Sequence, residues 1–266
     1  MRRALLLPVE IWNNRRLIVK LAVNDFRTRY AGSYLGIIWA FIQPVITVFV
    51  YWMVFGLGFK SGMTADMPFV VYLVSGIVPW FYMQELLNAG TNSLIEYSYL
   101  VKKVVFKISV LPMVKALSAL FVHAFFVLVA IIIAWLYRIP PSLYDLQILY
   151  YFFCMFVFTL GIVYGTCSIV IFFRDLTQII AILLQVGIWT VPIMWNLSIV
   201  PEKWQFLFRI NPMYYVINGY RDSICRRVLF TAHPWMTLYF WGVTAVLFII
   251  GTVVFKRLKV HFADVL

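Results

Sequence analysis

Acidic residues are scarce in this chain, and so are charged residues as a whole. Of its 266 residues only 10 are Asp or Glu, 12% are charged and 64% are hydrophobic. A water-soluble chain of this length has no single core large enough to bury so much apolar surface. The composition therefore excludes a soluble globular protein and predicts an integral membrane protein.

Cysteine is equally rare, and several motifs of enzyme chemistry are missing. Cys154, Cys167 and Cys225 have neither metal-ligand nor disulfide spacing, so we expect packing roles. The sequence contains no G-x-x-x-x-G-K-[ST], so the chain binds no nucleotide through a P-loop of its own. It contains no H-E-x-x-H and no paired acidic cluster, which argues against an enzyme.

Asp and Glu are also absent from the middle of the long apolar stretches, which argues against a proton- or sodium-coupled carrier. His123 is the only acid–base candidate deep in such a stretch. We expect it to be a hydrogen-bonded packing residue.

Six apolar stretches predict an all-α membrane fold with six transmembrane helices. At 1.5 Å per residue, about 20 residues cross the ~30 Å hydrocarbon core of a bilayer. Pro79 inside the second stretch predicts a kink, because its ring removes a helical hydrogen bond. The fifth stretch is barely long enough and contains Pro192. The predicted helices cover residues 35–59, 69–87, 111–137, 148–173, 179–195 and 235–255.

A polar interruption separates the second and third spans. Ser93 is followed three residues later by Glu96, the spacing at which a hydroxyl and a carboxylate satisfy backbone N–H groups at a helix start. Lys102 and Lys103 follow, where a helix C-terminus and anionic lipid head groups both favour cations. We predict a short helix at residues 91–103 that lies on the cytoplasmic membrane surface as a lever.

The segment before the first span, residues 9–30, is too charged to cross a bilayer and too periodic to be a tail. At about 100° per residue, Val19, Val23 and Phe26 fall on one stripe, and Arg16, Lys20 and Arg27 fall on an adjacent one. This pattern predicts an amphipathic helix in the membrane interface. The alternative is a charged flank with no special role.

A second interruption covers residues 201–227, and its prolines predict two short helices. Pro201 and Pro212 fit a first helical turn, and Asn211 is a good N-cap for the second helix. That helix is apolar but carries Arg221. We expect a re-entrant hairpin packed against protein at membrane depth. A surface-lying amphipathic pair is the alternative.

The cations predict the orientation of the six spans. With an even number of spans both termini lie on one side, and 15 of the 22 Lys and Arg residues fall on that side. The positive-inside rule then makes the termini and the lever cytoplasmic and places residues 201–227 outside. The basic residues flank spans instead of forming one patch, so we expect no nucleic-acid partner.

Several short motifs in this order resemble the type 2 permeases of ABC exporters. They are Asp25-x-x-x-Arg29-Tyr30-x-x-Ser33-x-Leu35-Gly36-x-x-Trp39 with Pro44, Leu100-x-Lys102-Lys103-x-x-Phe106 with Leu111-Pro112, Arg174-Asp175, Pro192, and Asn211-Pro212-Met213. The resemblance covers nearly the whole chain, residues 1–266, as a single permease domain. More narrowly, the chain resembles permeases that export lipid-linked cell-wall or surface polymers, above all wall teichoic acid.

The resemblance implies a homodimer in a bacterial cell membrane, bound to two separate ATPase subunits that hold ATP and Mg. No cofactor is implied for this chain. The cargo would be a polymer, foremost teichoic acid, on undecaprenyl diphosphate. The alternatives are an O-antigen or capsular polysaccharide, and more distantly a lipid-modifying membrane enzyme or a secondary carrier.

The resemblance also implies roles for named residues. It makes the lever a coupling helix seated in the ATPase and residues 201–227 an external gate. The coupling residues are Ser93, Leu94, Glu96, Tyr97, Lys102 and Lys103, and the gate residues are Pro201, Asn211, Pro212, Tyr215, Ile217 and Arg221.

Two further sets come from the chemistry of such a cargo. Aromatic faces let sugars and lipid slide without tight binding, and among the 50 aromatic residues we select Trp39, Trp80, Phe81, Trp189 and Trp195 as channel residues. A diphosphate head group needs cations at the depth of the lipid head groups, for which we select Lys20, Arg27 and Arg29. The alternative for these cations is simple anchoring to membrane lipids.

Overall fold

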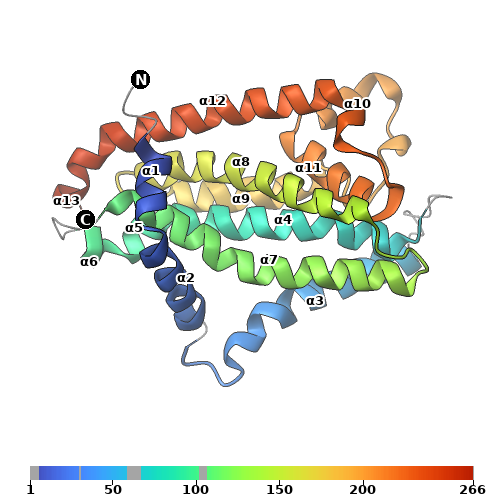
Figure 1. The fold of residues 1–266 in the computed structure, drawn as a ribbon, viewed down its shortest axis with the longest axis horizontal. Helices are drawn as coiled ribbons and strands as arrows, with labels where there is room; N and C mark the ends of the chain where they lie inside the picture. Colours follow the sequence, from blue (N-terminus) through green and yellow to red (C-terminus); the bar gives the residue numbers. More distant parts are fainter. Residues whose placement is uncertain (1–5, 30, 59–66, 102–106, 266) are drawn as a thin grey trace.

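The computed structural model describes residues 6–29, 31–58, 67–101 and 107–265. The described chain is an all-helical bundle in which the long helices α4 (Phe69–Thr91), α7 (Leu111–Leu136), α8 (Gln147–Ile169) and α12 (Pro234–Leu258) run side by side (Figure 1). This confirms the all-α membrane class predicted from composition and apolar stretches.

Five helical segments of the described residues are long and apolar enough to cross a membrane. They are Gly36–Gly58, Phe69–Thr91, Ile108–Leu136, Leu143–Ile169 and Pro234–His261. The first of them begins as a 3₁₀ turn, continues as α3 (Trp39–Tyr51) and ends as a π-helix, Trp52–Gly58. It is barely buried, whereas α4 is buried along most of its length.

The predicted fifth span differs from the structure. Its helix, α9 (Leu176–Thr190), has 15 residues, which at 1.5 Å per residue gives about 22 Å, less than a bilayer core. The helix stops before Pro192 because a proline disfavours helical dihedrals in the residue before it, and Val191 is accordingly extended, with φ −116° and ψ 132°. The boundary predicted at residue 195 is therefore wrong.

Close packing of α8 on α12 depends on glycine. A Cβ atom on Gly251 would lie 2.0 Å from the carbonyl oxygen of Gly161, and a Cβ atom on Gly161 would lie 2.9 Å from Cα of Phe248. The two backbones therefore meet directly, as small residues permit in membrane helices.

The N-terminal segment forms two helices, α1 (Leu6–Asn13) and α2 (Arg15–Arg29). The buried face of α2 carries Ile18, Ala22 and Asp25, and Ile18 and Ala22 pack with Val110 and Val114 at the start of α7. The predicted apolar stripe lies on a different side of α2 from this packed face, and Val19 on it is half exposed, so the interfacial role of the helix stays a prediction. The buried face of α2 instead includes the polar Asp25, because its carboxylate binds Lys115 and Tyr97 inside the protein.

The polar stretch after the second span is also arranged differently from the prediction. Helix α4 runs on to Thr91, and the lever consists of two single turns, α5 (Ser93–Glu96) and α6 (Ser98–Val101), which are separated at Tyr97. Asn92 occupies the N-cap position, and Ser93 is buried with no partner for its hydroxyl. The predicted Ser93–Glu96 capping box is therefore absent, because Glu96 binds Lys115 instead. Lys102 and Lys103 lie outside the described residues.

The second interruption forms α10 (Glu202–Arg209) and α11 (Pro212–Arg221), followed by a π-helix, Asp222–Arg226. Asn211 caps α11 as predicted, since its side chain accepts a hydrogen bond of 3.0 Å from the N–H of Met213. Pro201 takes the N-cap position of α10, one residue earlier than predicted. Helix α11 packs against α4 and α8, whereas α10 has no buried residue.

The two interruptions lie at opposite ends of the bundle (Figure 1). Helices α5, α6, α1 and α13 (Phe262–Val265) lie at one end, and α10 and α11 lie at the other.

Candidate functional site

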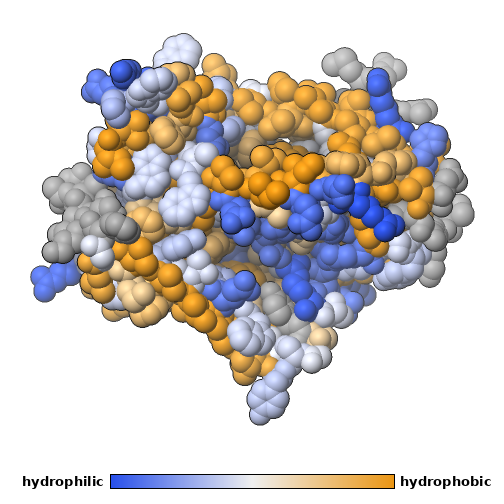
Figure 2. Space-filling model, turned by 180° about the vertical axis from the view of Figure 1, so that it is seen from behind, coloured by the Kyte–Doolittle hydropathy of each residue, from blue (hydrophilic) through white to orange (hydrophobic). Residues whose placement is uncertain are grey.

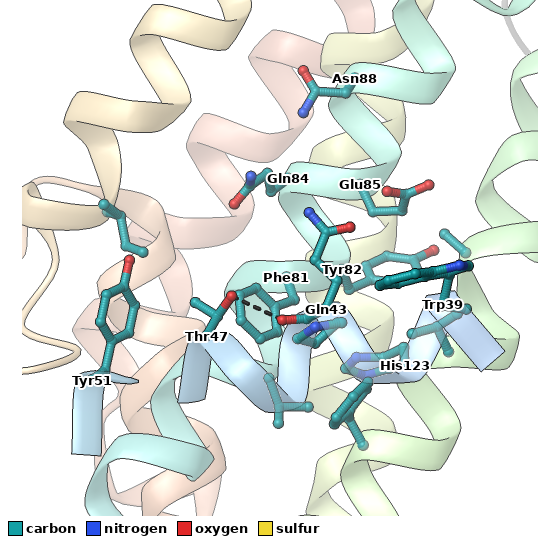
Figure 3. Close-up of a pocket in the computed structure, with 17 residues that line it drawn as sticks. Trp39, Gln43, Thr47, Tyr51, Phe81, Tyr82, Gln84, Glu85, Asn88 and His123 are labelled. Atoms are coloured by element: carbon teal, nitrogen blue, oxygen red, sulfur yellow. Dashed lines mark hydrogen bonds between the residues drawn. The ribbon is translucent and has the colours of Figure 1, made fainter. Parts of the chain in front are cut away.

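A cavity of about 260 Å³ lies between α3, α4 and α7. Gln84, Glu85 and Asn88 lie on one side of α4, as the spacing i, i+1, i+4 on a helix requires, and they line the cavity together with Gln43 and Thr47 of α3 (Figure 3). The face of the molecule opposite to that of Figure 1 shows hydrophilic residues in a hollow bordered by hydrophobic surface (Figure 2). The cavity therefore holds polar side chains within an otherwise apolar bundle.

Aromatic rings complete the wall of this cavity. Trp39, Tyr51, Phe81 and Phe126 line it, from α3, α4 and α7. Of the five predicted channel aromatics, the structure brings Trp39 and Phe81 to the cavity.

The other three lie elsewhere. Trp80 is buried on the far side of α4, where a Cβ atom on Gly187 of α9 would lie 2.9 Å from its ring. Trp189 packs on Phe55 at 6.2 Å and Trp195 on Phe208 at 5.1 Å between ring centroids.

A cluster of charged residues lies next to this cavity, in a cleft of about 520 Å³ that shares Glu85 and Asn88 with it. Lys115 Nζ of α7 lies 2.6 Å from Asp25 Oδ1 of α2 and also forms an ion pair with Glu96 of α5. Arg29 lies 3.2 Å from Asp25 Oδ2 and also pairs with Glu85 of α4. The cluster therefore ties four helices together by charge.

Asp25 is the centre of this network. Its Oδ1 also accepts a hydrogen bond of 2.8 Å from the hydroxyl of Tyr97. Burial by itself raises the pKa of Asp25, but the hydrogen bond and charge of Lys115, with the hydrogen bond from Tyr97, outweigh it and hold the pKa below its ordinary value. Burial and the neighbouring Asp25 raise the pKa of Tyr97. Asp25 is thus an ionised acceptor and Tyr97 a neutral donor at neutral pH.

The family model for ABC-2 type transporters matches residues 16–225, most of the chain and all four helices of the cluster. The chain belongs to the ABC-2 type transporter family.

Full-length relatives agree with this assignment. The chain is 27% identical over 257 residues, 94% of this chain and 95% of the relative, to the O-antigen export system permease protein RfbA of Klebsiella pneumoniae. It is 24% identical to the protein of the same name from Myxococcus xanthus, over 96% of this chain and 97% of the relative. It is 21% identical to the polysialic acid transport protein KpsM of Escherichia coli, over 77% of this chain and 79% of the relative.

As a member of this family, the chain is a multi-pass membrane permease. It is the membrane subunit of a transporter and works with ATP-binding subunits. Permeases of this family are membrane subunits of transporters and not enzymes by themselves.

The predicted entry cations of the permease have different surroundings. Arg29 is engaged by Asp25 and Glu85, whereas Lys20 and Arg27 on the same helix are exposed. Lys20 and Arg27 therefore fit a head-group site better than Arg29, whose charge is already balanced inside the cluster.

The predicted gate residues lie at the far end of the bundle. Tyr215, Ile217 and Arg221 are all buried on α11. The hydroxyl of Tyr215 lies 2.9 Å from Thr237 of α12 and 3.2 Å from Tyr150 of α8. Helix α11 is therefore fixed to the bundle on several sides.

Sequence reasoning missed Asp25, Lys115 and Glu85 as site residues. One signal was present, because Lys115 follows Leu111-Pro112 at the start of an otherwise apolar stretch, and an ionisable residue in a membrane helix usually has a partner. His123 forms the hydrogen bond expected of it, with Nε2 2.9 Å from the hydroxyl of Tyr220, and its ring stacks on Phe152.

Proposed function

We propose that this chain is the permease subunit of an ATP-driven exporter that moves a lipid-linked surface polysaccharide of the O-antigen or capsular class out of a bacterial cell. The observation that carries the proposal is similarity over nearly the full length to O-antigen export permeases. A polysialic acid transport protein points to the same cargo class. The relatives thus favour the polysaccharide alternative over wall teichoic acid.

The cavity between α3, α4 and α7 supports a transport path. Amide side chains and a carboxylate on α4 offer hydrogen bonds to sugar hydroxyls, and Trp39 and Phe81 offer flat apolar faces. The diphosphate of an undecaprenyl carrier would first meet the exposed cations Lys20 and Arg27 on α2, at the depth of the lipid head groups. From there the glycan would enter along the polar side of α4.

The same proposal includes a homodimer and two ATP-binding subunits that carry ATP and Mg. The first span supports a second copy of the chain, because α3 and the π-helix after it expose a continuous apolar surface that includes Val45, Ile46 and Phe49. A partner span there would pack on the side of α3 that faces away from the cavity.

The lever would couple ATP hydrolysis to this path. Glu96 and Tyr97 bind Lys115 and Asp25, and Arg29 connects Asp25 to Glu85 in the cavity wall. A force on α5 is therefore transmitted through ion pairs to α2, α4 and α7. In this proposal α5 and both termini are cytoplasmic, and α10 and α11 face outward as the gate.

Export in the host tests the proposal. A tagged chain, purified from its own membranes, is expected to bring an ATP-binding subunit with it, and its depletion is expected to remove a surface polysaccharide while the lipid-linked form accumulates inside. Loss of wall teichoic acid with an intact surface polysaccharide would show that the cargo is wall teichoic acid. An unchanged cell surface would refute the exporter assignment.

The lever is tested by a Glu96→Gln, Tyr97→Phe double variant, which keeps the shapes of both side chains but removes the negative charge that faces Lys115 and the hydroxyl that donates to Asp25. We expect export to fall about tenfold or more at a normal protein level, given about 1.5–3 kcal/mol for each hydrogen bond to a charged group. Tyr99→Phe is the matched control, because Tyr99 is an exposed neighbour with no bond to the cluster. Normal export by the double variant would contradict the coupling role.

A further inference from the structure

A second cavity, of about 380 Å³, lies at the end of the bundle far from α5 and α6. Its wall comes from α4, α8, α11 and the segment that follows α9. Tyrosine rings and carboxamides line it, among them Tyr72, Tyr151, Tyr214, Asn196 and Asn218. Flat rings next to amide donors and acceptors are suited to sugar rings and their hydroxyls.

The charges in this cavity are unbalanced. Arg209, Arg221 and Arg226 line it together with Asp222 and His233. Asp222 is already paired, because its Oδ1 lies 3.2 Å from Arg226 and its Oδ2 lies 3.8 Å from His233. Arg209 donates only to the neutral side chain of Gln205, at 2.9 Å. Two of the three guanidinium groups therefore have no carboxylate partner among the described residues.

Arg221 is the decisive residue because it is 1% exposed. Its guanidinium carbon lies 3.6 Å from the centroid of the Tyr72 ring. Nη2 donates to the carbonyl oxygen of Ile193 at 3.2 Å, and Nε and Nη2 both donate to the carbonyl oxygen of Tyr72 at 3.4 Å, so its partners are carbonyl groups and no carboxylate. Gly76 of α4 provides the space for this guanidinium group, because a Cβ atom on that residue would lie 2.7 Å from Nη2. Burying a charge without a counter-ion is unfavourable. The buried charge of Arg221 therefore adds positive potential at the wall of the cavity and favours an anion there, where Arg209 offers an exposed guanidinium group.

We propose that this cavity is a binding subsite for an anionic group, a phosphate diester or a carboxylate, on the glycan that leaves the transporter. The exposed guanidinium group of Arg209 can bind the oxygens of such a group, while the tyrosines and amides contact the sugar that carries it. The inference rests on the proposed function, which places this end of the bundle outside the cell. An anion subsite would restrict the proposed cargo class to acidic polysaccharides.

Saturation-transfer NMR on the purified chain in phosphatidylcholine nanodiscs tests the subsite with defined probes. Glucuronic acid and glucose 1-phosphate are expected to give ligand signals, and glucose at the same concentration is expected to give a signal at least severalfold weaker. The Arg209→Gln variant is expected to bind the acidic probes about tenfold more weakly, as the loss of one charged hydrogen bond predicts.

Lys203→Gln is the matched control, because Lys203 is an exposed cation on the same helix as Arg209 but does not line the cavity. It is expected to bind as the natural chain does. Both variants change exposed side chains and leave the buried Arg221 in place. Equal signals for glucose and glucuronic acid, or an equal loss in Lys203→Gln, would overturn the proposal.

Nanodiscs that contain phosphatidylglycerol show whether the natural ligand of this cavity is a glycan or an anionic lipid head group. Acidic-sugar binding that persists in this lipid supports the glycan subsite, whereas its loss would assign the cavity to the lipid head group and overturn the inference. These measurements use the permease chain alone and involve neither an ATP-binding subunit nor export. Their failure would therefore leave the exporter assignment standing, which the depletion experiment tests separately.

Discussion

Asp25 and Lys115 show how a buried charge pair is kept in a membrane protein. Both side chains are about 5% exposed, so neither is solvated by water, and each has at least two polar partners within the cluster. Removal of Lys115 leaves Asp25 with Arg29 as its one charged partner, and removal of Asp25 leaves Lys115 with Glu96, so each loss leaves a buried charge less well compensated. The cluster is therefore stable only as a unit.

Lys115→Ala tests this unit. We expect it to lower the free energy of unfolding by about 3–5 kcal/mol, because Asp25 then loses its closest counter-ion. An Asp25→Ala, Lys115→Ala double variant should lose less than the sum of the two single variants. Thermal unfolding of the purified chain measures all three, with the exposed Lys203→Ala as a neutral control. Additive losses would show that the pair is not coupled.

Acid should weaken the same cluster. The pKa of Asp25 lies below its ordinary value of 3.8, so its stabilising contribution is fully present above that value and is lost as pH falls through the lower folded pKa. We expect the unfolding temperature of the natural chain to fall more steeply below about pH 4 than that of Asp25→Asn, which has no carboxylate to titrate. Parallel curves for the two proteins would contradict the role of Asp25.

At the scale of helices, the contact of α8 with α12 is set by the absence of side chains. Gly161 and Gly251 bring the two backbones together, and the aromatic pairs Phe158–Phe240 and Tyr164–Phe255 pack on either side of that point at 5.8 Å and 5.3 Å. Between membrane helices the hydrophobic effect is weak, so dispersion over such a close contact supplies the attraction. A single methyl group at this point separates the helices.

Gly251→Ala should therefore destabilise the protein by about 1–3 kcal/mol, because the new methyl group overlaps the carbonyl oxygen of Gly161. Gly242→Ala on the same helix is the matched control. A Cβ atom there meets nothing within 4 Å, and alanine is the better helix former by about 1 kcal/mol. Unfolding in a denaturing detergent should rank Gly251→Ala below the natural chain and Gly242→Ala at or above it. The reverse order would refute close helix contact.

At the scale of the whole molecule, the two ends of the bundle differ in what they expose. One end holds the charge cluster with α2, α5 and α13, and the other holds α10, α11 and the second cavity (Figure 1). The excess of Lys and Arg near the first end is the reason to propose that this end is cytoplasmic, as the positive-inside rule predicts.

Cysteine labelling measures this orientation. In a chain with Cys225→Ser, whose other two native cysteines are buried, Ser198→Cys should react with a membrane-impermeant maleimide on intact cells. Tyr99→Cys and His261→Cys, at exposed positions of the other end, should react only after the membrane is permeabilised. Labelling of Tyr99→Cys on intact cells would show that the chain has the opposite orientation in the membrane.

The sequence by itself determined the membrane class, the apolar helices and most of their positions, because burial in lipid requires long apolar runs that are visible residue by residue. Local rules also placed the N-cap at Asn211, since that bond spans two residues. The same rules failed where a distant partner competed. Glu96 fits a capping box by spacing, but Lys115, which lies 19 residues away, binds it instead.

Only the tertiary structure decided which polar residues belong together. Asp25, Glu85, Glu96 and Lys115 come from four helices and share no spacing in the chain, so only the packed bundle brings them within hydrogen-bond distance. The same holds for Arg221, whose place against Tyr72 and Gly76 depends on how α11 meets α4. Inside a membrane protein the favourable partner for a charge is another buried polar group, and which one is near depends on the fold.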